Sequence, residues 1–340
     1  MAGITGPMAD LGMSGRNAVQ LAVDQCNEQG GIQGRRVKLI IRDDHQDART
    51  AVMAVQDLTR QGVAAIVGPM ASNMGMAVVP YLNAARVPAV APTVTTTELS
   101  GLDDYFFRVC ITSKEHAEKS AAYQIRSNSM RRIGITYDDS NRALSTSWLA
   151  HFKEKFVAGG GEILKVVQFN TNEKPSFTGI VNELTAPGPD GVLIIANSTD
   201  CAMLCQQIRK SDPFIKITSS HWAGSQRFLE MGGNAVEGVT LPVAFDHNSP
   251  NPHYLKFRKI YSERYQREPG FAGTYAYDAA QVVLTALQNR QPEQGVKEAI
   301  LSIGGLKGLQ SDIRFDAYGD MESAPISMRI VRNRKFVAAE

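Results

Sequence analysis

Hydroxyl side chains gather in two short loops of the sequence, and each loop leads into a predicted helix. Ser72 ends the loop 68–72, and Thr93 and Thr95 lie with two further threonines in the loop 91–98. Hydroxyls beside the free backbone N–H groups of a helix N-terminus can bind an anion, and a carboxylate needs no cationic partner there. Serine and threonine are also favoured N-caps. The pattern therefore indicates a carboxylate site, plain capping, or both.

The other reactive side chains do not combine into a catalytic site. His45 follows a predicted strand within the acidic run 42–47, where we expect it to solvate and cap the loop. Ser140 and Ser145 lack the Gly-x-Ser-x-Gly elbow of a hydrolase nucleophile. No glycine-rich phosphate loop follows a strand, and no Walker-type Lys-Ser/Thr occurs. We therefore predict a protein that is not an enzyme and binds no cofactor.

Cysteine spacing gives no metal site either. Cys201 and Cys205 are four residues apart on a predicted helix, but no histidine or acidic cluster completes a set of four ligands. We expect these two, with Cys26 and Cys110, to be small buried apolar residues.

Composition excludes several classes of partner. The 340 residues carry 36 basic and 34 acidic side chains, a net charge of +2, and no basic run, so we expect no nucleic-acid partner. Apolar stretches such as 191–196 are too short to cross a bilayer. Residues 1–7 resemble the end of a strand followed by a loop, so we expect the front of that strand and any signal peptide to lie upstream of Met1.

The elements that position these loops alternate between strand and helix. Strands are predicted at 37–41, 64–68, 88–91, 132–136, 162–169, 191–196, 215–218 and 238–241, and helices at 51–61, 74–85, 145–158, 177–184 and 200–209. This rhythm indicates two α/β halves with parallel sheets and helices on both faces. The last third differs, with helices near 254–264, 275–287 and 294–302 and strands near 313–315 and 326–331. It is too short for a third unit, so we expect it to pack on the earlier halves.

Motifs spread over the whole chain share one resemblance. They are the loop 5–12, the segment 21–36, Asp43-Asp44, Val67-Gly-Pro69, Ala91-Pro92, Phe107-Arg108, Tyr137-Asp-Asp139, Tyr275-Ala-Tyr-Asp-Ala279 and Phe315-Asp316. In these motifs the chain resembles the type I periplasmic binding proteins of the Leu/Ile/Val-binding family, which feed ABC transporters.

The resemblance implies two doubly wound parallel-sheet lobes joined by three crossover strands, near 111–115, 241–247 and 323–328. Lobe 1 would comprise residues 1–112 plus 247–324, and lobe 2 residues 113–246 plus 325–340. The ligand would lie in the cleft between the lobes, and hinge closure would trap it.

The resemblance also implies roles for individual residues. Ser72 matches the serine that binds the ligand carboxylate, Thr93 a position that bonds through its backbone, and Thr95 the threonine whose hydroxyl contacts the ligand. Leu11 occupies the place of an aromatic against the ligand side chain.

The second half departs from the family pattern. Arg142 stands where many members have a tyrosine, and Asn197 replaces another tyrosine near a strand end. The segment 219–225 contains His221 and Trp222 but no acidic residue to pair with a ligand ammonium. Arg142 would either favour a second polar group on the ligand or lie in solvent. Trp222 and Tyr275 are each candidates for a pocket aromatic or a core residue.

The sequence thus predicts the extracytoplasmic binding component of an ABC uptake transporter, periplasmic or extracellular, with or without a lipid anchor. Its ligand would be a small carboxylate, either an amino acid or an aromatic or other organic acid. We expect a monomer that meets a membrane permease. The alternative is a ligand-sensing regulatory domain of the same fold.

Overall fold

Two hydrophobic cores form from chain segments that are far apart in the sequence. The computed structural model describes residues 1–6, 9–127 and 130–339, so residues 7–8 of the expected first ligand loop lie outside the described residues. Unit 1 comprises Met1–Ile111 and Phe245–Ala324, and unit 2 comprises Thr112–Ala244 and Pro325–Glu340. Each unit is described separately below.

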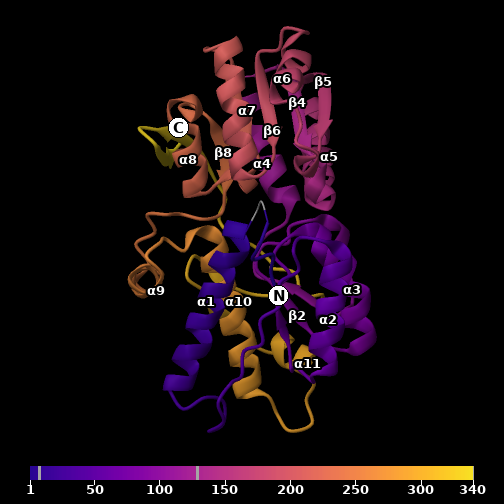
Figure 1. Cartoon of the computed structure of the whole chain (residues 1–340), viewed down its shortest axis with the longest axis vertical. Coiled ribbons are helices and arrows are strands. Elements are labelled where there is room, and N and C mark those ends of the chain that lie inside the picture. The colour runs from indigo at the N-terminus through magenta and orange to yellow at the C-terminus, as the bar shows by residue number, and fades with distance from the viewer. Residues whose placement is uncertain (7–8, 128–129, 340) are drawn as a thin grey trace. The chain divides into compact units, whose positions relative to one another are not determined.

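Unit 2 is built on one seven-stranded sheet (Figure 1). Its strand order is β12-β11-β8-β7-β6-β4-β5, and the strands from β8 to β5 run parallel whereas β11 is antiparallel to β8 and β12. The strands are β4 (Arg132–Asp138), β5 (Glu162–Phe169), β6 (Gly191–Ile195), β7 (Lys216–Ser219), β8 (Thr240–Val243), β11 (Ser327–Arg332) and β12 (Lys335–Ala338). The helices are α4 (Ser113–Arg126), α5 (Arg142–Ala158), α6 (Phe177–Thr185), α7 (Ser198–Ser211) and α8 (Gln226–Gly232).

The central strand β6 shows why this sheet forms. All five of its residues are buried. A near-continuous apolar run of this kind is typical of a parallel strand covered by helices on both faces. One face of the sheet packs against a cluster from α6, α7 and α8, including Leu204 and Phe228.

Unit 1 has shorter strands and longer helices. A parallel sheet has the order β1 (Ile66–Val67), β2 (Ala89–Ala91) and β3 (Phe106–Arg108), and β9 (Leu306–Lys307) pairs antiparallel with β10 (Asp312–Ile313). The helices are α1 (Ala9–Glu28), α2 (Ala48–Arg60), α3 (Ser72–Ala85), α9 (Pro252–Tyr265), α10 (Gly270–Asn289) and α11 (Val296–Leu301).

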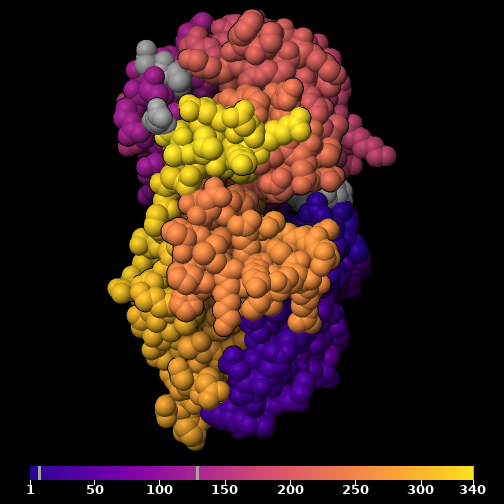
Figure 2. Space-filling view, turned by 90° about the vertical axis from the view of Figure 1, so that its left-hand side faces the viewer, coloured from indigo at the N-terminus to yellow at the C-terminus, as the bar shows by residue number. Residues whose placement is uncertain are grey.

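The last third of the chain joins the first third within unit 1. Ala18 and Leu21 of α1 lie in one cluster with Tyr261 of α9 and Ala280 of α10. Figures 1 and 2 show this arrangement as indigo N-terminal residues beside orange residues of α9 and α10. In unit 2, Figure 2 shows the yellow C-terminal residues lying over orange ones, which agrees with the pairing of β11 on β8.

The predicted strand at 37–41 does not form as a ladder strand. This segment has no assigned secondary structure, and the described bridges near it are Ala2 with Asp43, which is parallel, and Ile32 with Arg35, which is antiparallel. Its apolar pattern is that of a buried strand, but residues 1–2 supply a neighbour only at its C-terminal end. Ile41 is accordingly 40% exposed.

The described elements without a counterpart among the sequence predictions include α4, α8, β3, β9 and β12. Helix α4 illustrates the reason. Its buried face consists of small and polar side chains, including Ser113, Ala117, Ser120 and Gln124, so the sequence carries little apolar periodicity. In the part of the chain that the structure describes, no helix is long and apolar enough to span a membrane.

Candidate functional site

Ser72 joins two loops at the carboxyl ends of β1 and β2. It is the first residue of α3, and the N-cap position is held by Ala71, which makes no side-chain capping bond. The Ser72 hydroxyl, fully buried, instead accepts hydrogen bonds from the backbone N–H groups of Thr95 (3.2 Å) and Thr96 (3.3 Å). Ser72 therefore does not cap its own helix, and its hydroxyl still carries one proton that it can donate.

The threonines of the facing loop have three different roles. Thr93 donates from its hydroxyl to the Met70 carbonyl at 2.5 Å. Thr96 caps the short helix 97–99 by accepting from the N–H of Glu98 at 3.3 Å. Thr95 is 3% exposed, and its buried hydroxyl oxygen has no hydrogen-bond partner in the part of the chain that the structure describes. Plain capping thus accounts for Thr96 but not for Thr95.

An unpaired buried hydroxyl is costly, roughly 1–3 kcal/mol, and in a native structure it requires an explanation. Thr95 lies next to Ser72, because the backbone N–H groups of Thr95 and Thr96 donate to the Ser72 hydroxyl. Close by, α3 begins without a side-chain cap, so the positive end of its dipole is uncompensated by a carboxylate. The Thr95 hydroxyl and the Ser72 hydroxyl proton, beside this helix start, are neutral donors that can hold an anion.

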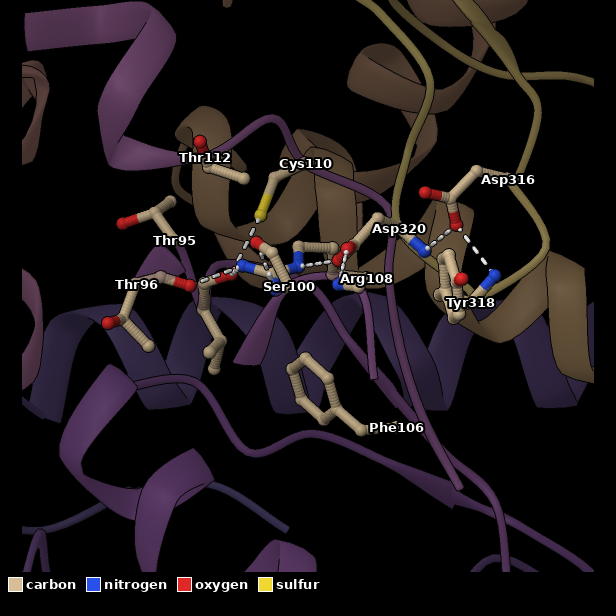
Figure 3. Close-up of polar contacts among 12 residues, drawn as sticks. Thr95, Thr96, Ser100, Phe106, Arg108, Cys110, Thr112, Asp316, Tyr318 and Asp320 are labelled. Carbon is tan, nitrogen blue, oxygen red and sulfur yellow. Dashed lines mark hydrogen bonds and ion pairs between the residues drawn. The ribbon is translucent and has the colours of Figure 1, made fainter. Parts of the chain in front are cut away.

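Arg108 fixes the shape of the threonine loop (Figure 3). Its guanidinium, fully buried, donates to the carbonyls of Val94 (3.3 Å) and Thr96 (2.7 Å) and to the hydroxyl of Ser100 (3.2 Å). Its Nε donates to Asp320 at 2.6 Å. Because Arg108 bonds both carbonyls that flank Thr95, it sets the direction in which the Thr95 backbone runs.

Asp320 is itself held by a tight turn. The Asp316 carboxylate accepts from the N–H groups of Tyr318 (2.9 Å) and Asp320 (3.0 Å), as Figure 3 shows. The carbonyl of Gly319 accepts from the N–H of Arg108 at 3.1 Å. The positive charge of Arg108 is therefore paired with Asp320 and with loop carbonyls. Sequence reasoning noted the Phe107-Arg108 motif but assigned it no role.

In unit 2, strand β7 leads into the short helix 221–223, which places His221 against His116 of α4. The two ring centroids are 4.0 Å apart with an angle of 38° between the planes. The Nδ1 atoms of both rings are buried, and neither has a hydrogen-bond partner within the described ranges. Burial lowers the pKa of His221 to about 3 and lowers that of His116 well below its usual value, the latter assisted by His221. Both imidazoles are therefore neutral near pH 7.

The carboxylates at the same end of the unit 2 sheet are already engaged. Asp138 accepts from the N–H of Ser140 (2.9 Å) and from the hydroxyl of Thr171 (2.8 Å). Asp200 accepts from the amide of Asn197 (2.7 Å) and shares the single hydroxyl proton of Thr171 with Asp138. Burial raises the pKa of Asp200, which these two hydrogen bonds oppose. Sequence reasoning did not anticipate this network, which caps and joins the loops after β4, β5 and β6.

The remaining candidate residues occupy varied positions. Asn197 is the N-cap of α7 and accepts from the N–H groups of Thr199 and Asp200. Arg142 begins α5 with a side chain 70% exposed, 3.8 Å from Asp139.

Leu11 and Met70 belong to one small apolar cluster of unit 1. Tyr275 packs against two cores of the same unit, and burial raises the pKa of its hydroxyl. Trp222 is 7% exposed.

Residues with metal-ligating side chains do not assemble. Within the described ranges, no group of three or more His, Cys, Asp or Glu side chains could hold a metal ion. Cys201 and Cys205 are fully buried in the unit 2 core, and all four cysteines are free thiols. His45 lies in the loop before α2, where its ring nitrogen is 2.7 Å from the Thr5 hydroxyl and Asp47 caps the helix.

Comparison with known proteins gives one consistent result. A family model described as periplasmic binding protein matches residues 2–329. The Leu/Ile/Val-binding protein BraC3 of Rhizobium johnstonii is 25% identical over 346 residues, which cover 100% of this chain and 92% of the relative.

Two solved structures share the fold. One is a branched-chain amino acid transporter substrate-binding protein from Streptococcus pneumoniae in complex with isoleucine, with a TM-score of 0.90, 20% identity and coverage of 100% and 97% of the two chains. The other is a solute-binding protein of an ABC transporter from R. palustris in complex with benzoate, with a TM-score of 0.87, 16% identity and coverage of 99% and 93%.

Proposed function

Because the chain belongs to the periplasmic binding protein family, we propose that it captures a small carboxylate-bearing molecule and presents it to the permease of an ABC uptake transporter. Proteins of this family are non-enzymatic binding components and are normally extracytoplasmic. The proposal concerns the class of ligand and the residues that bind it.

The observation that carries the proposal is the unpaired hydroxyl of Thr95. It is buried beside the Ser72 hydroxyl, which has a proton to donate, and close to the uncapped start of α3. A ligand carboxylate accepts from several neutral donors and would satisfy Thr95 and Ser72 together. We assign Thr93 a contact through its backbone, since its hydroxyl is already bonded to Met70.

The chemistry of unit 2 favours a ligand without an ammonium group. The segment 219–225 contributes the neutral ring of His221 and the largely buried Trp222, and it contains no carboxylate. Asp138 and Asp200 are committed to internal hydrogen bonds. An ammonium group taken out of water needs an anionic or well-bonded partner. We therefore expect an aromatic or other non-amino carboxylate to bind at least as well as leucine.

The family resemblance supplies the remaining part of the proposal. It implies that the two units act as lobes that close on the ligand, with Leu11, Arg142, Asn197 and Tyr275 as further candidates for contact. Of these, Asn197 and Tyr275 have structural roles in their own units, as N-cap and core residue. Arg142, exposed and at the start of a helix, is the freest of the four to meet a polar group on a ligand.

A matched ligand panel tests the proposal. Thermal shift and calorimetric titration would compare benzoate, leucine, isoleucine and benzylamine, which retains the aromatic ring but replaces the carboxylate by an ammonium. We expect benzoate-type acids to raise the melting temperature, leucine to do no better, and benzylamine to have no effect. Stabilisation by benzylamine would contradict the carboxylate assignment. Stabilisation by branched-chain amino acids alone would contradict the expectation about the ammonium group.

A further inference from the structure

The turn between α7 and β7 presents one aromatic side chain to solvent. Phe214 is 90% exposed, whereas the other exposed large apolar residues that the structure describes reach at most 54%. A single exposed apolar residue is ordinary on a protein surface, so exposure alone gives Phe214 no role. Its role depends on how the fold holds it and on which residues surround it.

The fold holds Phe214 outward on a fixed turn. The Asp212 carboxylate accepts from the backbone N–H groups of Phe214 (2.8 Å) and Ile215 (3.1 Å). The guanidinium of Arg209 donates to the Ile215 carbonyl. Ile215 is buried in the unit 2 core, so one side chain lies inside and its neighbour lies in solvent. Because the turn is already ordered, Phe214 would lose little entropy on entering a partner.

Phe214 lies at the edge of the sheet where the parallel strands of unit 2 begin. Two residues further along the chain, Lys216 starts β7. The register places Arg332 of β11 level with Lys216, two strands away. Arg132 of β4 lies one residue beyond the same level, two strands away on the other side. All three are exposed. At the usual strand spacing they span about 19 Å, with Phe214 near the middle.

This edge as a whole carries more basic than acidic residues. It consists of the segments that lead into the strands and of the turn between β11 and β12, namely residues 126–127, 130–132, 159–162, 186–191, 210–216, 237–239 and 332–335. These residues include eight basic and four acidic side chains, a net charge of +4, whereas the complete chain has +2. We call this surface the cationic edge. The sequence contains no basic run, because the sheet gathers these charges from distant segments.

The acidic residues of the cationic edge are engaged within it. Asp190 accepts from two backbone N–H groups ahead of β4, and Glu237 from two in the turn 332–335, at 2.8–3.1 Å. Asp212 fixes the aromatic turn. Glu162 forms an ion pair with Arg132 at 3.1 Å. These carboxylates therefore shape the edge and balance only part of its charge.

Several cations of the edge have no acidic partner. Lys210, Arg332, Arg334 and Lys335 are exposed, and none of them forms an ion pair with a described residue. Their charged groups can meet an anionic partner without first leaving a carboxylate. The cationic edge thus complements a negatively charged surface, and Phe214 adds one apolar contact to it.

We propose that the cationic edge, with Phe214 near its middle, is a docking surface for a bilayer that contains anionic lipid. Each cation near the headgroups would raise the affinity about fivefold. Phe214 would enter the boundary between the headgroups and the acyl chains. This role goes beyond ligand capture and is independent of the carboxylate site, whose loops lie in unit 1 at the carboxyl ends of β1 and β2.

A bilayer is favoured over an acidic protein as the partner. Phe214 projects from its turn, so a protein would need a pocket matched to it, whereas a fluid bilayer admits any projecting apolar side chain. The cations are spread over about 19 Å and do not converge on one point. Mobile lipid headgroups can reach each of them, and the long stems of lysine and arginine can lie along apolar surface while their charges stay in water.

Vesicle sedimentation tests the proposal. The full chain would be mixed with phosphatidylcholine vesicles, with and without phosphatidylglycerol, at low and high salt. We expect binding only to the anionic vesicles, and loss of binding at high salt because the charges are screened. Lys210→Gln combined with Lys216→Gln should weaken binding by about 10- to 30-fold. The matched control, Lys256→Gln combined with Lys259→Gln on the exposed face of α9, should leave binding unchanged.

Substitutions of Phe214 separate insertion from charge attraction. Phe214→Ser should weaken binding about tenfold at an unchanged melting temperature, because the side chain lies in solvent. Tyr318→Ser, at an exposed aromatic of unit 1, should have no effect on binding. In Phe214→Trp, the introduced indole should shift its emission to the blue on anionic vesicles and be quenched by brominated acyl chains.

Several outcomes would overturn the proposal. Absence of vesicle binding, equal binding to neutral and anionic vesicles, or equal losses in the two lysine pairs would exclude the cationic edge as a bilayer surface. Binding without quenching of the introduced indole would exclude insertion at position 214. Binding of polyglutamate in the absence of vesicle binding would assign the edge to an acidic protein. Titration of the same variants with benzoate should give unchanged affinity, so the two proposals can fail separately.

Discussion

Replacing Thr95 by valine separates binding from stability. Valine has the shape of threonine, so the change removes the hydroxyl and little else. That hydroxyl is buried and has no hydrogen-bond partner among the described residues. Its removal should relieve part of a desolvation cost of roughly 1–3 kcal/mol, so we expect Thr95→Val to be more stable without ligand, by about 1 kcal/mol. This corresponds to a rise of about 2–4 °C in melting temperature.

The same substitution should weaken binding of the carboxylate. Loss of a hydrogen bond to a charged acceptor costs about 1–3 kcal/mol, which corresponds to a dissociation constant about 5- to 150-fold higher. The assays are thermal melting without ligand and calorimetric titration with the best acid of the panel. The matched control is Thr96→Val, which removes the cap of the helix 97–99 and should lower stability by about 0.5–2 kcal/mol.

The combination of outcomes is diagnostic. If Thr95→Val melted below the wild type without ligand, the hydroxyl would have a structural partner and the reasoning would fail. If it melted higher but bound the acid with unchanged affinity, Thr95 would not contact the ligand. Ser72→Ala should differ from both, because it leaves two buried N–H groups unpaired and so should lower stability and affinity together.

Three further predictions concern buried ionisable side chains. Arg108→Met leaves Asp320 and the loop carbonyls unpaired, so it should lower stability by about 3–5 kcal/mol and weaken ligand binding, as urea unfolding and titration would show. Burial holds the pKa of His221 near 3 in the folded protein, whereas an unfolded histidine titrates near 6.5. The protein therefore loses stability as the pH falls below about 6.5. His221→Gln should reduce this loss in melts between about pH 6.5 and 4. Burial raises the pKa of Asp278 to about 8 in the folded protein, whereas an unfolded aspartate titrates near 4. The folded protein therefore loses stability as the pH rises from about 4 to 8. The free energy of unfolding of Asp278→Asn should therefore exceed that of the wild type at pH 8, by on the order of 1–3 kcal/mol. Near pH 4 the two values should be similar.

The fold could be predicted from the sequence because it depends on short apolar runs and on motifs distributed along the whole chain. The run 191–196 predicted β6, observed at Gly191–Ile195, and alternating strands and helices predicted parallel α/β sheets. The family expected from the motifs is confirmed by the match over residues 2–329. The prediction failed where burial depends on a distant neighbour. The segment 37–41 has the composition of a strand but pairs only at its end, and α4 buries polar side chains that carry no periodic signal.

The site residues stay a prediction, and the sequence could not distinguish their roles for a related reason. Hydroxyls in loops before helices pointed to Ser72 and Thr95, but residue type alone could not separate a capping threonine from an unpaired one. That distinction needs the position of Glu98 relative to Thr96. Arg108 escaped prediction because its partner Asp320 is 212 residues away in the chain. No sequence pattern encodes that pairing.

If the proposed carboxylate site is correct, the role of Arg108 explains how it works with neutral donors. A guanidinium at the ligand would bind a carboxylate strongly, but a paired buried ion is hard to release and desolvate on each cycle of capture and delivery. In this protein the buried charge of Arg108 is balanced by Asp320, and its guanidinium donates hydrogen bonds to the carbonyls of Val94 and Thr96. The loop is thereby fixed with its N–H groups and the Thr95 hydroxyl positioned before any ligand arrives. In the proposed site the cation would thus contribute preorganisation, which lowers the entropic cost of binding, and would leave direct contact to groups that carry no charge.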